Sequence, residues 1–521
     1  MKILGISGMF HDASATMIED GKILFAGHAE RYSREKNDPF LNKQLMTEAC
    51  QYGMPDVIVL HESSKLKNQR RFGQMTWGTV MSTIKTSMQE PTMEDWLQRF
   101  YPQFNGIPVT NCLHHQSHAA AGMLTLPHED WRDAAIVTID AIGEKQTATI
   151  STWEKGKRIL LRHEVNFPSS LGLFYSAVTS ACDLKPMEDE YILMGMAAYG
   201  KPVYKERMEK ELFTHSVDDW HNCLETVDMS KGLPKNFISK EEYQFDTKKV
   251  KFDLAASAQA VVEERIIAYC RLAFKYSGGS RNLVYMGGVA LNCVANSLIY
   301  KEDVFKNIWI MPNPGDAGSS LGAAALYYYE QTGKMVEWEG PYLGTNIQGA
   351  WPKEKFLDSL RKGVIFGVAN GKAEFGPRAF GNRSLFADAR GTTIKDKVNK
   401  IKRRQEFRPF APIVLEEHAK EWFDMPAGKA QSPYMSFVAK CLKPEEIPAV
   451  VHADGTSRVQ TVNRDQHPEL YHAMRQWYAE TGCPVVLNTS LNIKGQPIVN
   501  TEQEAEEFAK HYKVKVHCRD D

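Results

Sequence analysis

Two segments far apart in this 521-residue chain carry side chains that could hold a metal ion. His114 and His118 are separated by one helical turn, so on a helix both imidazoles would project from the same face and could share one ion. Asp316 lies in a loop of small residues, 313–320, where its carboxylate could complete the site. The same loop precedes an apolar helix predicted over residues 321–327, so its free backbone N–H groups could also bind a phosphate.

Each of these features has an ordinary explanation when it stands alone. A histidine pair at this spacing is more often solvated or helix-capping than metal-binding, and a glycine-rich loop is more often a turn than a phosphate cradle. Their conjunction favours a metal ion held against a nucleotide.

A repeated pattern in the first two-thirds of the chain would position these residues. Strands are predicted over residues 2–7, 15–18 and 22–29, with a polar loop after the first. The pattern recurs over residues 134–140, 146–153 and 158–164. Two such units separated by helical sequence predict a duplicated α/β architecture whose lobes face each other across a cleft.

The loop after each first strand would point into that cleft. Asp12 and Asp140 lie in or beside these loops, which makes both candidates for phosphate or metal contact, although either Asp alone would more often cap a turn. Further along, a long helix over residues 254–276 precedes a strand at 282–286 that runs into Gly287 and Gly288. A strand, paired glycines and then a helix would let the backbone approach a nucleotide closely.

Composition excludes some classes of protein. The 63 basic and 64 acidic side chains give a net charge of -1, so the whole chain has no attraction to nucleic acid or anionic membrane. No apolar run approaches the length of a membrane span, and the short apolar start does not resemble a signal peptide. Nine cysteines without CxxC spacing fit a reducing compartment. We therefore expect a cytoplasmic protein that does not contact a membrane.

Blocks of sequence along almost the whole chain resemble one family, the O-carbamoyltransferases of the nodulation and antibiotic-tailoring type. The blocks are Leu4 to Ile6, His11 to Ala13, Glu30 to Lys36, His114 to Ala120, Asp140 with Gly143 and Glu144, Met194 to Gly200, Met286 to Asn292, Pro312 to Ser320, Phe375 to Ser384, Lys402 to Pro412 and Leu487 to Asn492.

The resemblance implies a fold, two domains and a reaction. Residues 1–344 would form the actin-like ATPase (ASKHA) fold, and residues 345–521 a YrdC-like α/β domain. In the family, carbamoyl phosphate is cleaved in the second domain, ATP adenylates the resulting carbamate, and carbamoyl-AMP delivers its carbamoyl group to an acceptor hydroxyl in the first.

The resemblance also assigns site residues by matching positions. The metal ligands would be His114, His118, Asp140 and Asp316, and the ion would be Fe²⁺ or another divalent metal such as Mn²⁺ or Mg²⁺. The glycine loops and the basic stretch after Arg31 themselves make Lys36, Gly287, Gly288, Asn292, Gly315 and Ser319 the candidate ATP contacts. Carbamoyl phosphate contacts would come from Arg378, Lys402, Arg408, Arg458, Ser490 and Asn492. His11 would be the catalytic base for the acceptor hydroxyl, oriented by Asp12.

The donor-site residues make chemical sense by themselves. Carbamoyl phosphate is a small dianion with a planar amide end, so its pocket needs fixed cations and a few hydroxyl or amide partners. Within the basic run at residues 400–408, Lys400, Arg403 and Arg404 are expected on a solvated face. The prolines and phenylalanines after Arg408 favour a pocket there.

One departure from the family pattern bears on the acceptor. Where a lysine commonly precedes the Met-Gly at 194–195, this chain has Tyr191-Ile192-Leu193 after three acidic residues, which could signal a different acceptor. We expect a hydroxylated small natural product or sugar. A hydroxymethyl pyrimidine in a nucleotide or in DNA is the alternative, since Lys65, Lys67, Arg70 and Arg71 form a basic cluster near Phe72 and Trp77.

Two further points stay open at the level of sequence. A protein of another class, an ATP-binding kinase-like or regulatory protein, would use the same cleft without the cationic residues of the second domain. A homodimer is also compatible with the chain.

Overall fold

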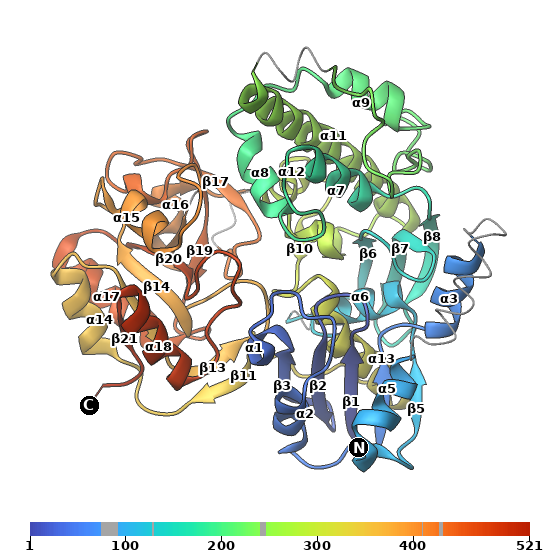
Figure 1. Cartoon of the computed structure of the whole chain (residues 1–521), viewed down its shortest axis with the longest axis horizontal. Coiled ribbons are helices and arrows are strands. Elements are labelled where there is room, and N and C mark those ends of the chain that lie inside the picture. The colour runs from blue at the N-terminus through green and yellow to red at the C-terminus, as the bar shows by residue number, and fades with distance from the viewer. Residues whose placement is uncertain (74–91, 128–129, 240–245, 409, 427–430, 521) are drawn as a thin grey trace.

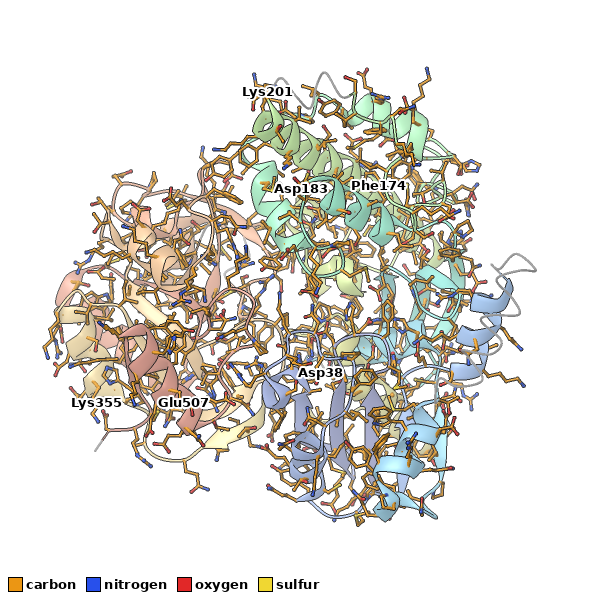
Figure 2. The ribbon with its side chains drawn as sticks, viewed as in Figure 1. Asp38, Phe174, Asp183, Lys201, Lys355 and Glu507 are labelled. Carbon is orange, nitrogen blue, oxygen red and sulfur yellow. The ribbon has the colours of Figure 1, made fainter. Side chains whose placement is uncertain are left out.

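Figure 1 shows the computed structural model, which describes residues 1–73, 92–127, 130–239, 246–408, 410–426 and 431–520. Two lobes of the N-terminal part lie one above the other, and the C-terminal part lies beside both. Buried side chains such as Phe174 fill the lobes, while Lys201 and Glu507 lie on the outside (Figure 2).

The first lobe is built on a five-stranded sheet of order β3-β2-β1-β4-β5. Its strands are β1 (Lys2–Ser7), β2 (Ser14–Glu19), β3 (Lys22–His28), β4 (Val57–Leu60) and β5 (Val109–Asn111). The strands β1, β2 and β3 form an antiparallel meander, and β4 and β5 continue the sheet in parallel with β1. The polar loop after β1 therefore opens at the carboxyl edge of the parallel strands.

The second lobe repeats this topology strand for strand. Its sheet has the order β10-β9-β6-β7-β8 and consists of β6 (Asp133–Ile139), β7 (Gln146–Glu154), β8 (Leu160–Asn166), β9 (Asn282–Met286) and β10 (Asn307–Trp309). Again three antiparallel strands are followed by two parallel ones. The predicted duplicated actin-like fold is confirmed, and the loops after β1 and β6 lie at equivalent edges of the two sheets.

Two helices join the lobes at the centre. They are α6 (His114–Met123), which carries the histidine pair, and α13 (Ser319–Thr332), which begins directly after the Asp316 loop. Gly333, at a positive φ of 72°, ends α13. Each helix contains a run of alanine and glycine, residues 119–122 in α6 and 322–325 in α13, so their backbones pack closely against each other and against the strands.

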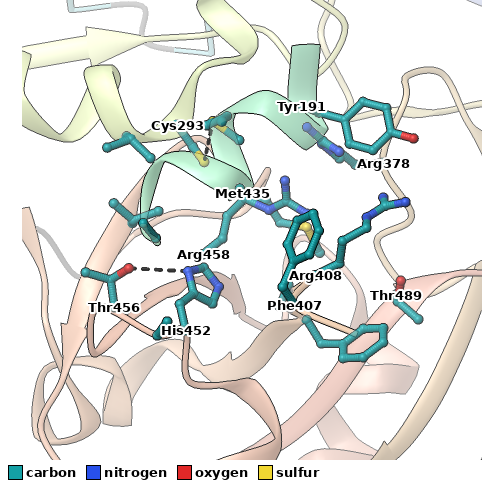
Figure 3. Close-up of a pocket in the computed structure, with 18 of the residues that line it drawn as sticks. Tyr191, Cys293, Arg378, Phe407, Arg408, Met435, His452, Thr456, Arg458 and Thr489 are labelled. Atoms are coloured by element: carbon teal, nitrogen blue, oxygen red, sulfur yellow. Dashed lines mark hydrogen bonds between the residues drawn. The ribbon is translucent and has the colours of Figure 1, made fainter. Parts of the chain in front are cut away.

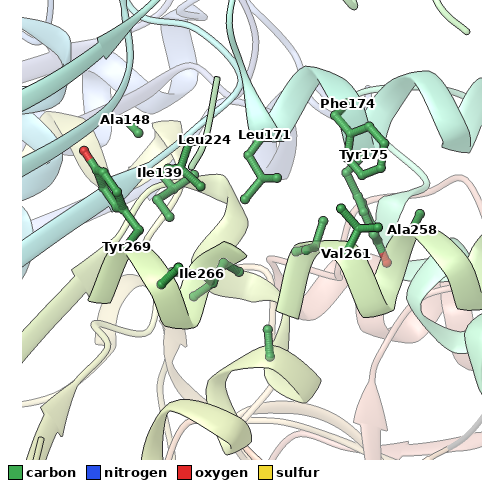
Figure 4. Packing of buried hydrophobic residues seen from close by; sticks show 14 of the residues in the cluster. Ile139, Ala148, Leu171, Phe174, Tyr175, Leu224, Ala258, Val261, Ile266 and Tyr269 are labelled. Carbon is green, nitrogen blue, oxygen red and sulfur yellow. The ribbon is translucent and has the colours of Figure 1, made fainter. Parts of the chain in front are cut away.

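The long helix α11 (Thr247–Tyr276) covers the second sheet and begins earlier than the sequence pattern predicted, because Asp246 caps its first turn. Figure 4 shows Ala258, Val261 and Ile266 of this helix among buried side chains that include Ile139 and Leu171. The other helices of the N-terminal part are α1 (Glu30–Ser33), α2 (Lys43–Cys50), α3 (Ser64–Gly73), α5 (Met93–Phe100), α7 (Leu171–Ala181), α8 (Glu190–Ala197), α9 (Lys205–Leu212) and α12 (Cys293–Lys301).

The C-terminal part is a mixed α/β domain, which agrees with the predicted YrdC-like class. Its six-stranded sheet has the order β19-β15-β20-β14-β12-β21, with strands β12 (Phe366–Ala369), β14 (Arg383–Asp388), β15 (Ala411–Leu415), β19 (Gln460–Val462), β20 (Val485–Ser490) and β21 (Lys515–His517). Its main helices are α14 (Lys353–Arg361), α15 (Ile394–Ile401), α17 (Pro468–Thr481) and α18 (Glu502–Tyr512). A small sheet joins β16 (Phe423–Asp424), β17 (Val438–Cys441) and β18 (Thr456–Arg458).

The connection between the two parts is a strand. β11 (Tyr342–Ile347) pairs with β13 (Gly371–Glu374) and crosses the predicted boundary at residues 344 and 345, which stays a prediction. Among the helices that the structure describes, none is both long and apolar enough to cross a membrane.

The close contact between α6 and α13 generates a prediction about stability. A methyl group at Gly322 would lie 1.8 Å from the Ser117 carbonyl oxygen, so Gly322→Ala must push the two helices apart. We expect a loss of about 3 kcal/mol in the free energy of unfolding, measured by urea denaturation. The control is Gly195→Ala in α8, where a methyl group meets no atom within 4 Å. Equal midpoints for the two variants would contradict this packing.

Candidate metal and nucleotide site

Four buried side chains meet at one point between the lobes. His114 Nε2 lies 3.1 Å from His118 Nε2 and 3.2 Å from Asp140 Oδ2. His118 Nε2 lies 3.3 Å from both Asp140 Oδ2 and Asp316 Oδ1, and all four residues are at most 8 % exposed. The residues come from α6, the end of β6 and the loop before α13, so the structure brings together the complete set of predicted ligands.

The histidines are held in a ligand-like orientation. His118 Nδ1 lies 3.1 Å from the Pro314 carbonyl oxygen, and as a donor there it leaves Nε2 of the neutral ring with a lone pair. His114 Nδ1 lies 3.9 Å from a carboxylate oxygen of Glu62. The buried Glu144 accepts hydrogen bonds from the His114 and Ser63 backbone N–H groups and so fixes the first turn of α6.

The geometry and the charge both fit a divalent ion. Four donors about 2.1 Å from a tetrahedral ion would lie about 3.4 Å from one another, close to the separations found here. Burial alone would lower the pKa of His118, but Asp140 and Asp316 raise it to about 10. Two buried carboxylates therefore require positive charge at this point, and either protons or a divalent ion can supply it.

His11 and Asp12 lie together in the loop after β1. His11 Nδ1 is 2.9 Å from Asp12 Oδ2, and both side chains are about one-quarter exposed on the wall of a cavity that Asp140 and Asp316 also line. Burial opposes protonation of the imidazole, but the Asp12 carboxylate outweighs it and raises the pKa of His11 to about 10. Asp12 itself has a positive φ of 55°, which holds the loop in a conformation that non-glycine residues seldom adopt.

The predicted nucleotide contacts divide into two groups. Lys36, Gly288, Asn292 and Gly315 line the same cavity, whose volume is about 350 Å³. Gly287 and Ser319 are outside its lining. The Gly287 N–H donates to the Pro314 carbonyl, and Ser319 is fully buried in the first turn of α13. Gly288 has a second function, because its N–H donates to Asp140 Oδ1 and so helps to position that carboxylate.

A second, smaller chamber of about 130 Å³ adjoins this cavity, between the C-terminal part and helices α8 and α12 of the N-terminal part. We call it the arginine chamber, since its walls carry Arg378, Arg404, Arg408 and Arg458. Figure 3 shows Arg378, Arg408 and Arg458 in this chamber. Among its described lining residues, Asp454 supplies the single carboxylate. Burial and the neighbouring Arg458 lower the pKa of Arg378 to about 9, which shows how much like charge is gathered here.

Lys402 lies outside the lining of this chamber and lines the larger cavity instead. Its ammonium donates to the Ser490 carbonyl at 2.6 Å, and to the carbonyl and Oδ1 of Asn492 at 3.0 and 2.9 Å. The Ser490 hydroxyl in turn donates to Asn492 Oδ1 at 2.7 Å. The three predicted donor-site residues therefore form one network in which Lys402 fixes the loop that presents Ser490.

Sequence reasoning misplaced or missed some residues. Arg404, expected on a solvated face, instead lines both cavities with its guanidinium 4.1 Å above the Phe410 ring, because the chain turns inward after Lys402. His452, with Nδ1 3.3 Å from Thr456 Oγ1, also lines the arginine chamber, and burial lowers its pKa to about 4. No spacing pattern marked either residue, since both depend on how distant strands pair.

The family departure at Tyr191 lies where the two cavities meet. Tyr191 lines both, and its ring lies under the Lys36 ammonium at 5.2 Å and the Arg408 guanidinium at 4.7 Å. Ile192 and Leu193 point the other way and are buried in the core beneath α11. The position where the resemblance predicts a lysine is thus apolar here, while cations reach the same region from other elements.

Two cations of the basic cluster near residue 70 contact other groups of the protein. Lys67 is buried against Glu62, and Arg70 donates to the Gly143 carbonyl at 2.7 Å, next to the metal ligands. Lys65 is exposed. The side chains of Arg71 and Phe72, and the whole of Trp77, lie outside the described residues.

Comparison with known proteins assigns the family. The Carbamoyltransferase N-terminus family model matches residues 2–325, and the Carbamoyltransferase C-terminus model matches residues 357–520. The uncharacterized protein sll1178 of Synechocystis sp. is 33% identical over 96% of this chain and 93% of its own. Nodulation protein NolNO of Sinorhizobium fredii is 29% identical over 95% and 76%, and the 3'-hydroxymethylcephem-O-carbamoyltransferase of Amycolatopsis lactamdurans is 26% identical over 94% and 93%. The chain therefore belongs to the carbamoyltransferase family and is an enzyme of the nodulation and antibiotic-tailoring type.

Proposed function

We propose that this enzyme makes carbamoyl adenylate from carbamoyl phosphate and ATP and transfers its carbamoyl group to an acceptor hydroxyl. Water first cleaves carbamoyl phosphate to carbamate and phosphate. A carbamate oxygen then attacks the α-phosphorus of ATP and expels pyrophosphate. Finally the acceptor oxygen attacks the carbamoyl carbon, AMP leaves, and the hydroxyl proton passes to a base.

The observation that carries this proposal is the junction of the two cavities. Arg378, Arg404, Arg408 and Ser490 line both the arginine chamber and the larger cavity, which Asp140 and Asp316 also line. The chamber of about 130 Å³ suits a small dianion, while the cavity of about 350 Å³ falls in the range of nucleotide-sized ligands. A molecule activated at the arginines would need no release into solvent to reach His11.

The arginines suit the donor for electrostatic reasons. Burial removes the water that would screen the positive charges of Arg378, Arg408 and Arg458 from one another. A dianion bound among them would offset their mutual repulsion. Guanidinium groups also bind phosphate oxygens in pairs, which an ammonium cannot do. Lys402, already bonded to the Ser490 loop, would fix the hydroxyl that contacts the donor.

For the transfer step, His11 would accept the proton of the acceptor hydroxyl. Its neutral form is the base, and the Asp12 carboxylate holds the ring in place while favouring the protonated form. The neutral fraction therefore grows as pH rises towards the pKa of the imidazole. Asp12 would also stabilise the imidazolium formed during transfer.

The ion would be bound by His114, His118, Asp140 and Asp316. Two imidazole and two carboxylate donors suit Fe²⁺ or Mn²⁺ better than Mg²⁺, which prefers an all-oxygen shell. Such an ion, when bound, would neutralise charge on phosphate and carbonyl oxygens.

We favour a small natural product or sugar as the acceptor. The alternative, a hydroxymethyl pyrimidine in DNA, drew on the basic cluster near residue 70, and the inward contacts of Lys67 and Arg70 remove two of its cations from a free surface. A kinase-like protein would release ADP, whereas the proposed reaction releases pyrophosphate, so the products of ATP distinguish these classes.

The donor site can be tested with a matched pair of arginines from one basic run. Arg408→Gln should lower the formation of pyrophosphate and the AMP-linked product at least 100-fold, since it removes a charge-assisted phosphate contact. Arg403→Gln is the control, because Arg403 is exposed. The assay follows labelled carbamoyl phosphate with ATP. Release of ADP alone by the unaltered enzyme would reject the adenylation proposal.

Metal binding can be tested with two buried histidines of the same helix. His118→Gln should reduce bound iron or manganese, measured by elemental mass spectrometry, to below about one-tenth of the unaltered protein, since it removes one of the four ligands. His115→Gln should retain it, because the His115 ring faces Thr149 Oγ1 instead. Unchanged metal content in the His118 variant would reject the ligand assignment.

The base assignment predicts a pH effect with a definite sign. Because Asp12 raises the pKa of His11, Asp12→Asn should lower that pKa and move the acid limb of the transfer rate to lower pH by one unit or more. His11→Ala should slow transfer about 100- to 10,000-fold while leaving pyrophosphate formation intact. The measurement is carbamoyl transfer to a hydroxylated acceptor between pH 6 and pH 10. An acid limb that stays in place in the Asp12 variant would exclude His11 as the titrating base.

A further inference from the structure

The arginine chamber contains one polar group that the proposed chemistry has not yet used. Asn488, on β20, is fully buried and forms part of the chamber wall. Its side-chain oxygen Oδ1 has no hydrogen-bond partner among the residues that the structure describes. A buried amide oxygen without a donor is costly, so it calls for a ligand or a functional explanation.

The orientation of this amide is fixed by its other end. Asn488 Nδ2 donates to the Ala379 carbonyl at 2.9 Å and to Gln460 Oε1 at 2.6 Å. Gln460 is itself oriented, because its Nε2 lies 3.4 Å from the Phe380 carbonyl. A flipped Asn488 would set its oxygen against two acceptors, so the free atom must be the oxygen.

The position of Asn488 matches the shape of the donor. Asn488 and Ser490 are two residues apart on one strand, so their side chains leave the same face about 7 Å apart along it. Ser490 and the arginines would hold the phosphate end of a small acyl phosphate. The acyl end then points along the strand towards Asn488.

We infer that Asn488 Oδ1 accepts a hydrogen bond from the amide N–H of the carbamoyl group and so selects carbamoyl phosphate over acyl phosphates that lack this donor. This inference rests on the proposed function, because it assigns the donor to the arginine chamber. Acetyl phosphate has a methyl group where carbamoyl phosphate has its amino group, so the orphaned oxygen stays unpaired when acetyl phosphate binds. A site built around a buried acceptor rejects such an analogue strongly.

The test measures binding of carbamoyl phosphate, acetyl phosphate and inorganic phosphate to the full-length protein by calorimetry. The unaltered protein should bind carbamoyl phosphate at least tenfold more tightly than acetyl phosphate. Asn488→Leu should erase that preference while changing affinity for inorganic phosphate less than threefold. Asn296→Leu is the matched control, because Asn296 is also buried with an Oδ1 that lacks a described partner but is outside the chamber lining, and it should keep the preference.

The unaltered protein alone can decide the question if the Asn488 variant fails to fold. Equal affinities for carbamoyl and acetyl phosphate would overturn the inference and leave the proposed reaction standing. A clear carbamoyl preference without pyrophosphate formation from ATP would support Asn488 and reject the adenylation step. Failure of all three anions to bind would overturn the inference along with the donor site.

Discussion

The constraint on which the rest depends is the burial of two carboxylates and two imidazoles where the lobes meet, with each imidazole within 3.5 Å of both carboxylates. Charged groups removed from water must be compensated by opposite charge and by hydrogen bonds with good geometry. Here the Pro314 carbonyl and the Gly288 N–H fix the two kinds of ligand from outside. The lobes cannot separate or rotate at this point without leaving charge uncompensated.

Close backbone packing follows from this constraint. A methyl group at Gly143 would lie 3.0 Å from the His114 Cβ, and one at Gly318 would lie 2.0 Å from the Asn313 carbonyl oxygen. A methyl group at Gly287, which has a positive φ of 91°, would lie 2.2 Å from the Ile139 carbonyl oxygen, so no side chain fits there. The glycines of the family blocks therefore have a steric function, since they let α6, β9 and the Asp316 loop come near enough for the ligands to meet.

Sequence reasoning predicted the parts of this arrangement that depend on local periodicity. The spacing of His114 and His118 required only a helix, and the repeated strand pattern located Asp140 after β6 in the same way as Asp12 after β1. The failures were of another kind. Whether the side chains of Arg404 and Ser319 face solvent or the interior depends on contacts with distant residues. No local sequence pattern predicts those contacts. A glycine motif assigned Gly287 to the ATP contacts, but the Gly287 N–H already donates to the Pro314 carbonyl.

The two parts of the chain are joined by cations that reach across from the first lobe. The buried Arg31 donates to the Gly376 carbonyl at 3.1 Å, and Arg34 donates to the Pro497 and Ile498 carbonyls at 3.0 and 2.9 Å. These bonds hold the C-terminal loops that line the larger cavity, which Asp140 and Asp316 also line.

Tyr191 extends the same principle to the junction of the cavities. An aromatic face attracts cations without neutralising them, so a ring between Lys36 and Arg408 gathers positive charge from both parts of the chain and leaves it available to an anion. A lysine in the same helix would instead add a third cation and its repulsion. At Tyr191-Ile192-Leu193, α8 therefore has an aromatic face where the resemblance predicts a charge. That face attracts the cations of Lys36 and Arg408. Helix α8 can then bury Ile192 and Leu193 against α11 while Tyr191 lines both cavities where they meet.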